Sequence, residues 1–172
     1  YSGIIDEHIT VCQGVGVFDV SHMGEFWVKG PQALPFLQKV TSNDVSVLTP
    51  GKVQYTCFPN ETGGIVDDLL VYRMGAQRFF LVINASNIDK DVAWIMEHAK
   101  DFDVVVENQS EKYGEVAVQG PKTEEIVERI LGLQCSDLTF YTCKEVEVNG
   151  ETIIISRTGY TGEDGFEIYA SH

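Results

Sequence analysis

The feature that most constrains the fold is an internal repeat in which an apolar strand is followed by Gly-Pro and an amphipathic helix. The first copy spans residues 25–40, with its Gly-Pro pair at Gly30, and the second spans residues 115–131, with its pair at Gly120. Proline suits the first turn of a helix because its missing N–H is not needed there. Both copies therefore predict a strand, a tight turn and a helix with apolar residues at helical spacing.

The repeat extends beyond these segments. Further stretches match in pairs: Tyr55-Thr56-Cys57 with Tyr141-Thr142-Cys143, residues 68–73 with 152–157, and residues 80–86 with 166–171. In the last pair Glu167 replaces Leu81 within an otherwise apolar strand. A helix that begins after Ser86 or Asn87 and ends near Ala99 is expected to close the first copy. The second copy stops before such a helix.

This pattern predicts an α+β fold of two intertwined, repeat-related strand–helix–hairpin units. We expect residues 1–50 to form the first part of domain 1, residues 51–110 an inserted domain 2, and residues 111–172 the return to domain 1. The dipeptide Asn149-Gly150 indicates a hairpin turn in the last segment. Because the second copy lacks its closing helix and residues 1–12 form no clear strand, we expect a fold truncated at both ends, as in a piece of a longer protein. The sheet face left uncovered favours self-association.

Composition and charge argue against several classes of partner. Acidic residues outnumber basic ones by 26 to 12, which gives a formal net charge of −14, and this charge repels nucleic acid backbones. No apolar run approaches the roughly 18–20 residues that span a membrane. The cysteines Cys12, Cys57, Cys135 and Cys143 have no metal-ligand spacing. We therefore expect no nucleic acid, membrane or metal partner, and a reducing compartment: the cytoplasm or, in a eukaryote, the mitochondrial matrix.

Two adjacent carboxylates, Asp67 and Asp68, lie inside an apolar run that reads as a buried strand. Successive side chains of a strand point to opposite faces, so one of the two is expected to face the interior. An ionised carboxylate is costly there unless it is paired. A structure that tolerates this cost is expected to use the charge. The alternative is a strand end at which both carboxylates are exposed to solvent and have no functional role.

The glycine-rich segment 156–167 is the second candidate site. Its three glycines permit backbone conformations that most residues avoid, and Tyr160 and Glu167 flank the loop. A carboxylate at Glu167 can accept two parallel hydrogen bonds from a planar N–C–N edge, such as a guanidinium or an aminopyrimidine ring.

Four segments, in order, carry a resemblance to a known family: residues 16–24 (GVFDVSHMG), 41–44 (TSND), 63–72 (GGIVDDLLVY) and 157–167 (RTGYTGEDGFE). With them the chain resembles the T-protein of the glycine cleavage system, a tetrahydrofolate-dependent aminomethyltransferase that is about twice as long. The resemblance implies that an aminomethyl carbon passes from the lipoyl arm of the H-protein to tetrahydrofolate. Ammonia is released and 5,10-methylenetetrahydrofolate forms.

The resemblance also implies roles for individual residues. Asp68 is implied as the catalytic residue, because the second Asp of the family's pair stabilises the cationic carbon and orients N10 of the folate. The residues that match family folate ligands are Met23, Tyr55, Tyr72, Asn84, Tyr160 and Glu167. For Tyr72 and Tyr160, a place in the core is the alternative. The isolated 172 residues are expected to have little or no transferase activity.

Two other functions remain as alternatives. One is the folate-binding half of a dimethylglycine or sarcosine dehydrogenase, although the Asp pair and the segment 16–24 fit the T-protein better. The other is a non-catalytic, folate-binding iron–sulfur assembly factor. Its signature resembles Lys-Gly-Cys-Tyr-x-Gly-Gln-Glu, which this chain lacks, with Gly159 where the cysteine would stand.

Overall fold

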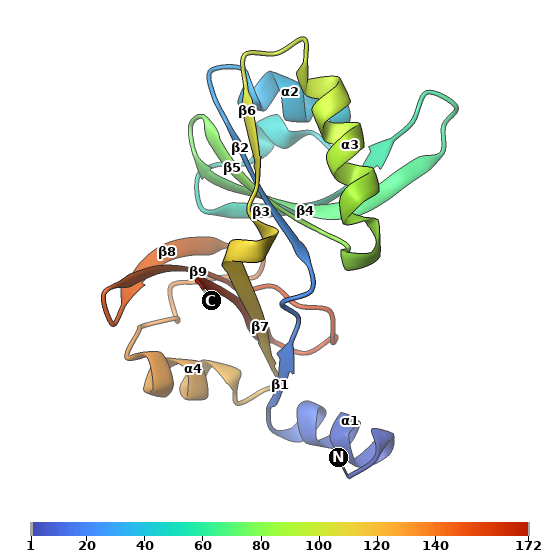
Figure 1. Cartoon of the computed structure of the whole chain (residues 1–172). Coiled ribbons are helices and arrows are strands. Elements are labelled where there is room, and N and C mark those ends of the chain that lie inside the picture. The colour runs from blue at the N-terminus through green and yellow to red at the C-terminus, as the bar shows by residue number, and fades with distance from the viewer. Residues whose placement is uncertain (1, 172) are drawn as a thin grey trace. The chain divides into compact units, whose positions relative to one another are not determined.

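The computed structural model describes residues 2–171 and has the α+β class predicted from the sequence (Figure 1). The helices are α1 (Ile4–Gln13), α2 (Ala33–Val40), α3 (Ile88–Ala99) and α4 (Thr123–Leu131), with short 3-10 turns η1 (Val45–Val47), η2 (Ala85–Asn87) and η3 (Ser110–Lys112). The strands are β1 (Gly16–Asp19), β2 (Gly24–Lys29), β3 (Lys52–Pro59), β4 (Ile65–Gly75), β5 (Arg78–Ile83), β6 (Val105–Asn108), β7 (Tyr113–Gln119), β8 (Cys143–Val148), β9 (Glu151–Ser156) and β10 (Gly165–Ser171). No helix within this described part is both long enough and apolar enough to cross a membrane.

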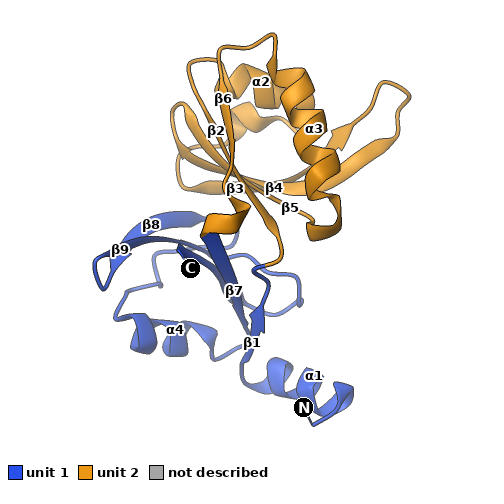
Figure 2. Ribbon diagram, viewed as in Figure 1, with its two compact units in different colours: residues 1–21, 113–172 blue, residues 22–112 orange. Residues whose placement is uncertain are grey.

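The chain forms two compact units (Figure 2). Unit 1 comprises residues 1–21 and 113–172, and unit 2 comprises residues 22–112. The sequence-based division placed its boundaries after residues 50 and 110, so the first boundary differs. The reason is β2, which pairs with both β5 and β6 and therefore belongs to the sheet of the later segment.

Unit 2 contains a five-stranded sheet in the order β3-β4-β5-β2-β6, with antiparallel neighbours. One face packs against α2 and α3 and forms the main core, which includes Phe26, Leu37, Leu81 and Ile95, none of them exposed. Each such side chain stabilises the fold by roughly 1.5–3 kcal/mol. The core therefore holds this sheet and its two helices together as one body.

Unit 1 contains a second five-stranded antiparallel sheet in the order β1-β7-β10-β9-β8. Its core is smaller and includes Val118, Val127 of α4, Ile155 and Phe166. The hairpin between β8 and β9 turns at Asn149-Gly150, whose φ angles of 52° and 87° are both in the left-handed region. The predicted hairpin turn is thereby confirmed.

The two sheets have the same internal architecture, which confirms the repeat. The strand order of one sheet, β3-β4-β5-β2-β6, corresponds strand by strand to the order of the other, β8-β9-β10-β7-β1. The two Gly-Pro turns also match, because Gly30 and Gly120 have φ angles of 130° and 131°. The N–H of Gln32 donates to the carbonyl of Asp103 at 3.2 Å, and the N–H of Lys122 donates to the carbonyl of Gly14 at 3.0 Å.

The register corrects the alignment of the last repeated strands by one residue. Phe166 corresponds to Phe79 rather than to Phe80. Phe166 pairs with Val118 of β7 and Phe79 pairs with Val28 of β2, and these two valines occupy equivalent positions in the repeat. Glu167 therefore takes the place of Phe80 and not of Leu81. A shift of one residue moves a side chain to the other face of a strand. Glu167 thus lies on the sheet face opposite the core of unit 1.

The match between the two Tyr-Thr-Cys segments is wrong. Tyr141 corresponds to Gly51 rather than to Tyr55, and both have positive φ, 58° and 86°. The N–H of Tyr141 donates to the carbonyl of Arg157 at 3.0 Å, and the N–H of Gly51 donates to that of Arg73 at 2.8 Å. The two Tyr-Thr-Cys segments therefore have the same sequence but do not occupy equivalent positions in the repeat.

The start of the chain completes the second copy. β1 pairs with β7 as β6 pairs with β2, and α1 precedes β1 as α3 precedes β6. This corrects the expectation that the second copy has no closing helix. However, no residue of α1 is buried, and Ile4 and Ile5 are largely exposed, whereas α3 buries Asp91 and Ile95. α1 therefore holds the place of α3 in the order of elements without its packing.

Candidate functional site

The two adjacent carboxylates of β4 point to opposite faces of the unit 2 sheet, as predicted. Asp67 alternates with Leu69 and Val71 of the main core and is 8% exposed. Asp68 points to the opposite face and is partly exposed. The strand therefore places one carboxylate beneath the sheet among apolar side chains and leaves the other accessible.

Asp68 is held by two side chains of neighbouring strands. The hydroxyl of Tyr55 on β3 donates to Asp68 Oδ2 at 2.8 Å. The amide Nδ2 of Asn84, directly after β5, donates to Asp68 Oδ1 at 3.0 Å and to its backbone carbonyl at 3.1 Å. Such bonds hold the carboxylate in one orientation.

Asn84 also joins the two carboxylates. Its Nδ2 lies 3.0 Å from Asp67 Oδ1 as well as 3.0 Å from Asp68 Oδ1. Because an amide nitrogen carries two protons, it can donate to both carboxylates at once. The side chains on the two faces of β4 are therefore linked through a single amide.

A buried aromatic cluster lies farther along the same face of the sheet, beyond Leu70 of β4. Cross-strand register places Tyr72 of β4, Phe80 of β5 and Trp27 of β2 side by side. Tyr72 is fully buried, with its ring 5.8 Å from that of Phe80 in an edge-on arrangement. Met23 directly precedes β2, whose first residue pairs with the residue before Asn84.

Five of the predicted residues lie in unit 2: Met23, Tyr55, Asp68, Tyr72 and Asn84. Hydrogen bonds join three of them, Tyr55, Asp68 and Asn84. The other two belong to unit 1. Tyr160 is fully exposed, and Glu167 accepts hydrogen bonds from the Thr158 hydroxyl and, at 3.4 Å, from that of Tyr169.

Sequence reasoning missed two buried acidic residues of unit 2. Glu25 of β2 is fully buried, neither of its oxygens has a hydrogen-bond partner within residues 2–171, and burial raises its pKa to about 8. Asp91 of α3 is also fully buried, and burial together with the neighbouring Asp67 raises its pKa to about 7. Glu25 could have been noticed in the sequence, because it is an acidic residue at the start of an otherwise apolar strand. Asp91 could not, because other polar residues surround it in the first turn of α3.

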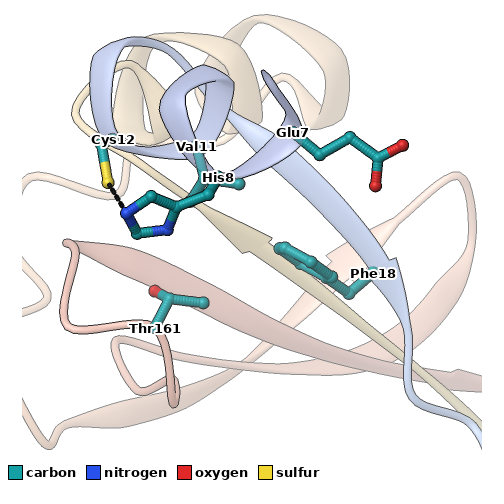
Figure 3. Close-up of a pocket in the computed structure, with 6 residues that line it drawn as sticks. All are labelled: Glu7, His8, Val11, Cys12, Phe18 and Thr161. Carbon is teal, nitrogen blue, oxygen red and sulfur yellow. Dashed lines mark hydrogen bonds between the residues drawn. The ribbon is translucent and has the colours of Figure 1, made fainter. Parts of the chain in front are cut away.

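Unit 1 contains a separate cavity of about 230 Å³, which Figure 3 shows in close-up. Its lining residues are Glu7, His8, Val11, Cys12, Phe18 and Thr161. Cys12 Sγ lies 3.7 Å from His8 Nε2, but burial and the nearby Glu163 raise the pKa of the thiol. This cysteine is therefore poorly suited to act as a thiolate nucleophile. No group of three or more His, Cys, Asp or Glu side chains in the described chain is arranged to hold a metal ion.

Comparison with known proteins identifies the family. Residues 1–172 match the family described as the GCVT N-terminal domain. The aminomethyltransferase of Bacteroides fragilis is 59% identical over 170 residues, which are 98% of this chain and 47% of that protein. For the aminomethyltransferase of Clostridium botulinum (strain Okra / Type B1) the identity is 50%, over 98% of this chain and 46% of that protein.

A solved structure agrees with this assignment. The glycine cleavage system aminomethyltransferase T from Bartonella henselae superposes with a TM-score of 0.89 at 36% identity, over 98% of this chain and 45% of that chain. The chain belongs to the GCVT N-terminal domain family, so the predicted resemblance is confirmed. It spans about half the length of the curated relatives it matches.

A more distant structure shares only the fold. The heterotetrameric sarcosine oxidase from Corynebacterium sp. U-96 superposes with a TM-score of 0.66 at 14% identity, over 97% of this chain and 82% of that chain. At this identity the likeness says nothing about activity.

Proposed function

We propose that this chain carries the catalytic and folate-binding part of an aminomethyltransferase of the glycine cleavage system, a transferase of glycine catabolism and one-carbon metabolism. The observation that carries the proposal is the partly exposed Asp68 carboxylate, which Tyr55 and Asn84 hold on the sheet face opposite the main core. The relatives named aminomethyltransferase favour this function over a dehydrogenase or an iron–sulfur assembly factor. We further propose a cytoplasmic location, or the matrix in a eukaryote.

The proposed reaction moves an aminomethyl carbon from a lipoyl sulfur of the H-protein to tetrahydrofolate. The carbon–sulfur bond breaks, bonds from the carbon to N5 and N10 form, and ammonia leaves. The two protons that N5 and N10 give up pass to the sulfur and to the ammonia, so the lipoyl group is released reduced. Tetrahydrofolate supplies both nucleophilic nitrogens.

Asp68 suits this chemistry because positive charge develops on the transferred carbon. A carboxylate that is already fixed by hydrogen bonds stabilises the charge without reorganising. It also orients the second nitrogen, which makes ring closure effectively intramolecular. Tyr55 and Asn84 hold Asp68 in this role.

The remaining contacts follow the family resemblance. Glu167 is proposed to bind the aminopyrimidine edge of the pterin through paired hydrogen bonds. Met23, Tyr55, Tyr72, Asn84 and Tyr160 are proposed as further folate contacts. The correction of the repeat register supports Glu167, because it moves this carboxylate from the core face to the opposite face of its sheet.

Calorimetric titration with tetrahydrofolate tests the proposal. The parent chain is expected to bind, Glu167→Gln to bind at least ~10-fold more weakly, and Asp68→Asn to change affinity by less than ~3-fold, since 1.4 kcal/mol corresponds to a factor of ten. The aminomethyltransferase of Bacteroides fragilis is the positive control. If that protein binds and the parent chain does not, the proposed folate site is refuted.

The isolated chain is proposed to have little or no transferase activity with lipoylated H-protein, because it spans only about half of its curated relatives. Ammonia release from aminomethylated H-protein measures this directly. Turnover equal to that of the full-length relative would contradict it.

A further inference from the structure

The two repeated units differ in the length of one strand connection. In unit 2, β4 and β5 are joined by residues 76–77, whereas in unit 1 the equivalent strands β9 and β10 are joined by residues 157–164. In both units the residue before the second strand accepts a hydrogen bond from the glycine of the Gly-Pro turn, at 3.0 Å in unit 2 and 2.7 Å in unit 1. The connection 157–164 is therefore an enlarged loop at an otherwise equivalent place, and it carries the fully exposed Tyr160.

A second difference between the units lies directly beneath this loop. Gln119 occupies the position that Lys29 has in unit 2, immediately before the Gly-Pro turn. Lys29 is partly exposed and forms an ion pair with Glu107 at 2.9 Å, whereas Gln119 is only 1% exposed. A buried side-chain amide is costly unless hydrogen bonds satisfy it. The change from an exposed cation to a buried amide thus accompanies the enlargement of the loop.

The side-chain amide of Gln119 binds the loop at both of its ends. Its Nε2 donates to the carbonyl of Thr158 at 3.1 Å, with a longer contact of 3.5 Å to the carbonyl of Phe166. Its Oε1 accepts from the hydroxyl of Thr161, which Figure 3 labels, at 2.8 Å. Because the nitrogen meets acceptors and the oxygen meets a donor, one orientation of the amide satisfies all of these contacts.

Two glycines leave the space that this amide fills. The three atoms nearest to a Cβ added at Gly159 all belong to the Gln119 side chain, at 2.0–2.4 Å. Gly165 pairs with Gln119 across the strands, and its added Cβ would lie 2.3 Å from Nε2. Neither of these glycines has a positive φ. Room for Gln119, rather than an unusual backbone conformation, therefore requires glycine at both positions.

Thr158 connects the loop to Glu167. Its carbonyl accepts from Gln119, and its hydroxyl donates to Glu167 Oε2. Thr158 is 3% exposed, and its Oγ1 also lies 2.6 Å from Ser156 Oγ. Because both ends of Thr158 are bonded, a displacement of its backbone also moves the hydroxyl that holds the Glu167 carboxylate.

We propose that Gln119 is a positioning residue, whose buried amide sets the path of loop 157–164 and, through Thr158, the orientation of the Glu167 carboxylate. The inference rests on the proposed function only in treating Glu167 as the carboxylate that binds the aminopyrimidine edge. Paired hydrogen bonds to a planar edge require a fixed carboxylate. Gln119 therefore affects which ligand Glu167 recognises without touching that ligand.

Hydrogen exchange of the parent chain tests the first contact without any ligand or substitution. The side-chain amide protons of Gln119 are expected to exchange with water at least ~10-fold more slowly than those of Gln134, because buried and bonded groups exchange only after local opening. Gln134 lies in the same unit but is exposed. Equal exchange rates at the two glutamines would overturn the proposal.

The variant Gln119→Met keeps the volume of the side chain and removes its hydrogen bonds. The backbone amides of residues 158–165 are expected to have NMR order parameters of about 0.85 in the parent and below about 0.6 in the variant. The carbon-13 signal of the Glu167 carboxyl should shift, and Thr158→Val, which removes only the hydroxyl, should shift it as well. Gln134→Met is the matched control and should leave the loop and the Glu167 signal unchanged.

A pair of substitutions tests the packing of Gln119 against the loop. Gly159→Ala should lower the melting temperature of the parent by about 4 °C or more, because the added methyl overlaps the amide. In the Gln119→Ala background the same change should cause no further loss. Gly165→Ala is the control, since its Cβ would also lie 2.7 Å from the carbonyl oxygen of Val118, and it should remain destabilising in both backgrounds.

Ligand discrimination separates positioning from a merely structural role. The ligands are tetrahydrofolate and an analogue without the 2-amino group of the pterin. The parent is expected to prefer tetrahydrofolate by ~10-fold or more, and Gln119→Met should reduce this preference below ~3-fold, as Glu167→Gln does. A variant that only lowers the folded fraction weakens both ligands by the same factor. An unchanged preference in Gln119→Met would therefore overturn the proposal.

The outcomes also separate this inference from the proposed function. If the chain binds no tetrahydrofolate but Gln119→Met loosens the loop and shifts the Glu167 signal, the proposed function fails and the positioning role stands. If the loop stays ordered and the Glu167 signal does not move, the positioning role is overturned whatever binds. The exchange rates in the parent and the Thr158→Val spectrum decide the matter even if Gln119→Met does not fold.

Discussion

Ser110 and Ser21 make the same hydrogen bond in the two repeated units. Ser110 Oγ accepts from the backbone N–H of Glu25 at 3.0 Å, and Ser21 Oγ accepts from that of Glu115 at 3.0 Å. Each serine follows an edge strand, β6 or β1, and binds near the start of the adjacent inner strand, β2 or β7. The hydroxyl thus supplies an acceptor where strand pairing has ended.

Replacing Ser110 with Ala should destabilise the chain by about 1–2 kcal/mol, because it leaves the buried N–H of Glu25 without an acceptor. Urea unfolding measures the change. Ser86→Ala, at an exposed serine, is the control and should change the free energy of unfolding by less than about 0.5 kcal/mol. Equal losses in both variants would contradict the assigned role of the Ser110 hydroxyl.

Gly120→Ala is expected to be severely destabilising. The residue has φ 131°, and an added Cβ would lie 2.4 Å from the carbonyl oxygen of Gly14 and 2.5 Å from that of Val11. Strain and overlap together should lower the free energy of unfolding by about 3 kcal/mol or more.

Gly132→Ala is the control for this glycine. Its φ is 66°, and nothing lies within 4 Å of an added Cβ, so only the backbone penalty of about 1 kcal/mol applies. Thermal unfolding should therefore show a lower melting temperature for Gly120→Ala than for Gly132→Ala. A Gly120 variant as stable as the Gly132 variant would refute the close approach of the two backbones.

Glu25→Gln should change how stability depends on pH. Burial raises the pKa of Glu25 to about 8 from an ordinary value of 4.5. A raised pKa means that the folded state binds the proton more tightly, so the contribution is full below about 4.5 and is lost as pH rises through about 8. The parent should therefore lose roughly 2–4 kcal/mol between mildly acidic and alkaline pH that the Gln variant retains.

The measurement is urea unfolding of both proteins at a series of pH values. Asp91 has the same sign of effect, with its pKa raised to about 7, so Asp91→Asn and the double variant should be measured beside Glu25→Gln. Parallel pH profiles for the parent and Glu25→Gln would show that Glu25 does not titrate with a raised pKa.

Tyr55 and Asp68 should be energetically coupled in the free energy of unfolding. Their side chains share a hydrogen bond of 2.8 Å, so the effects of Tyr55→Phe and Asp68→Asn should not add. A coupling free energy of about 0.5–1.5 kcal/mol is expected from a double-mutant cycle measured by urea unfolding. The same cycle of Tyr55→Phe with Asp89→Asn should give additive effects. Additivity in the first cycle would mean that the hydroxyl does not support Asp68.

Much of the candidate site was predictable because it depends on strand alternation. The opposite orientations of Asp67 and Asp68 follow from the period of a strand, and the chain confirms them. Which carboxylate faced the core did not follow, because both have apolar neighbours in the sequence. The positions of α2 and α3 decided that Asp67 lies beneath them.

The sequence by itself determined the repeat, the α+β class, the Asn149-Gly150 turn and the family, because each depends on local pattern or short motifs. Only the tertiary structure decided the register, the place of α1 and β1 in unit 1, and the contact of the Asn84 amide with both Asp67 and Asp68. A one-residue shift leaves an apolar strand looking the same along the chain but exchanges its faces. Hydrogen bonds between distant segments remove that ambiguity, and they also bring Asn84 to two carboxylates that lie 17 and 16 positions before it in the sequence.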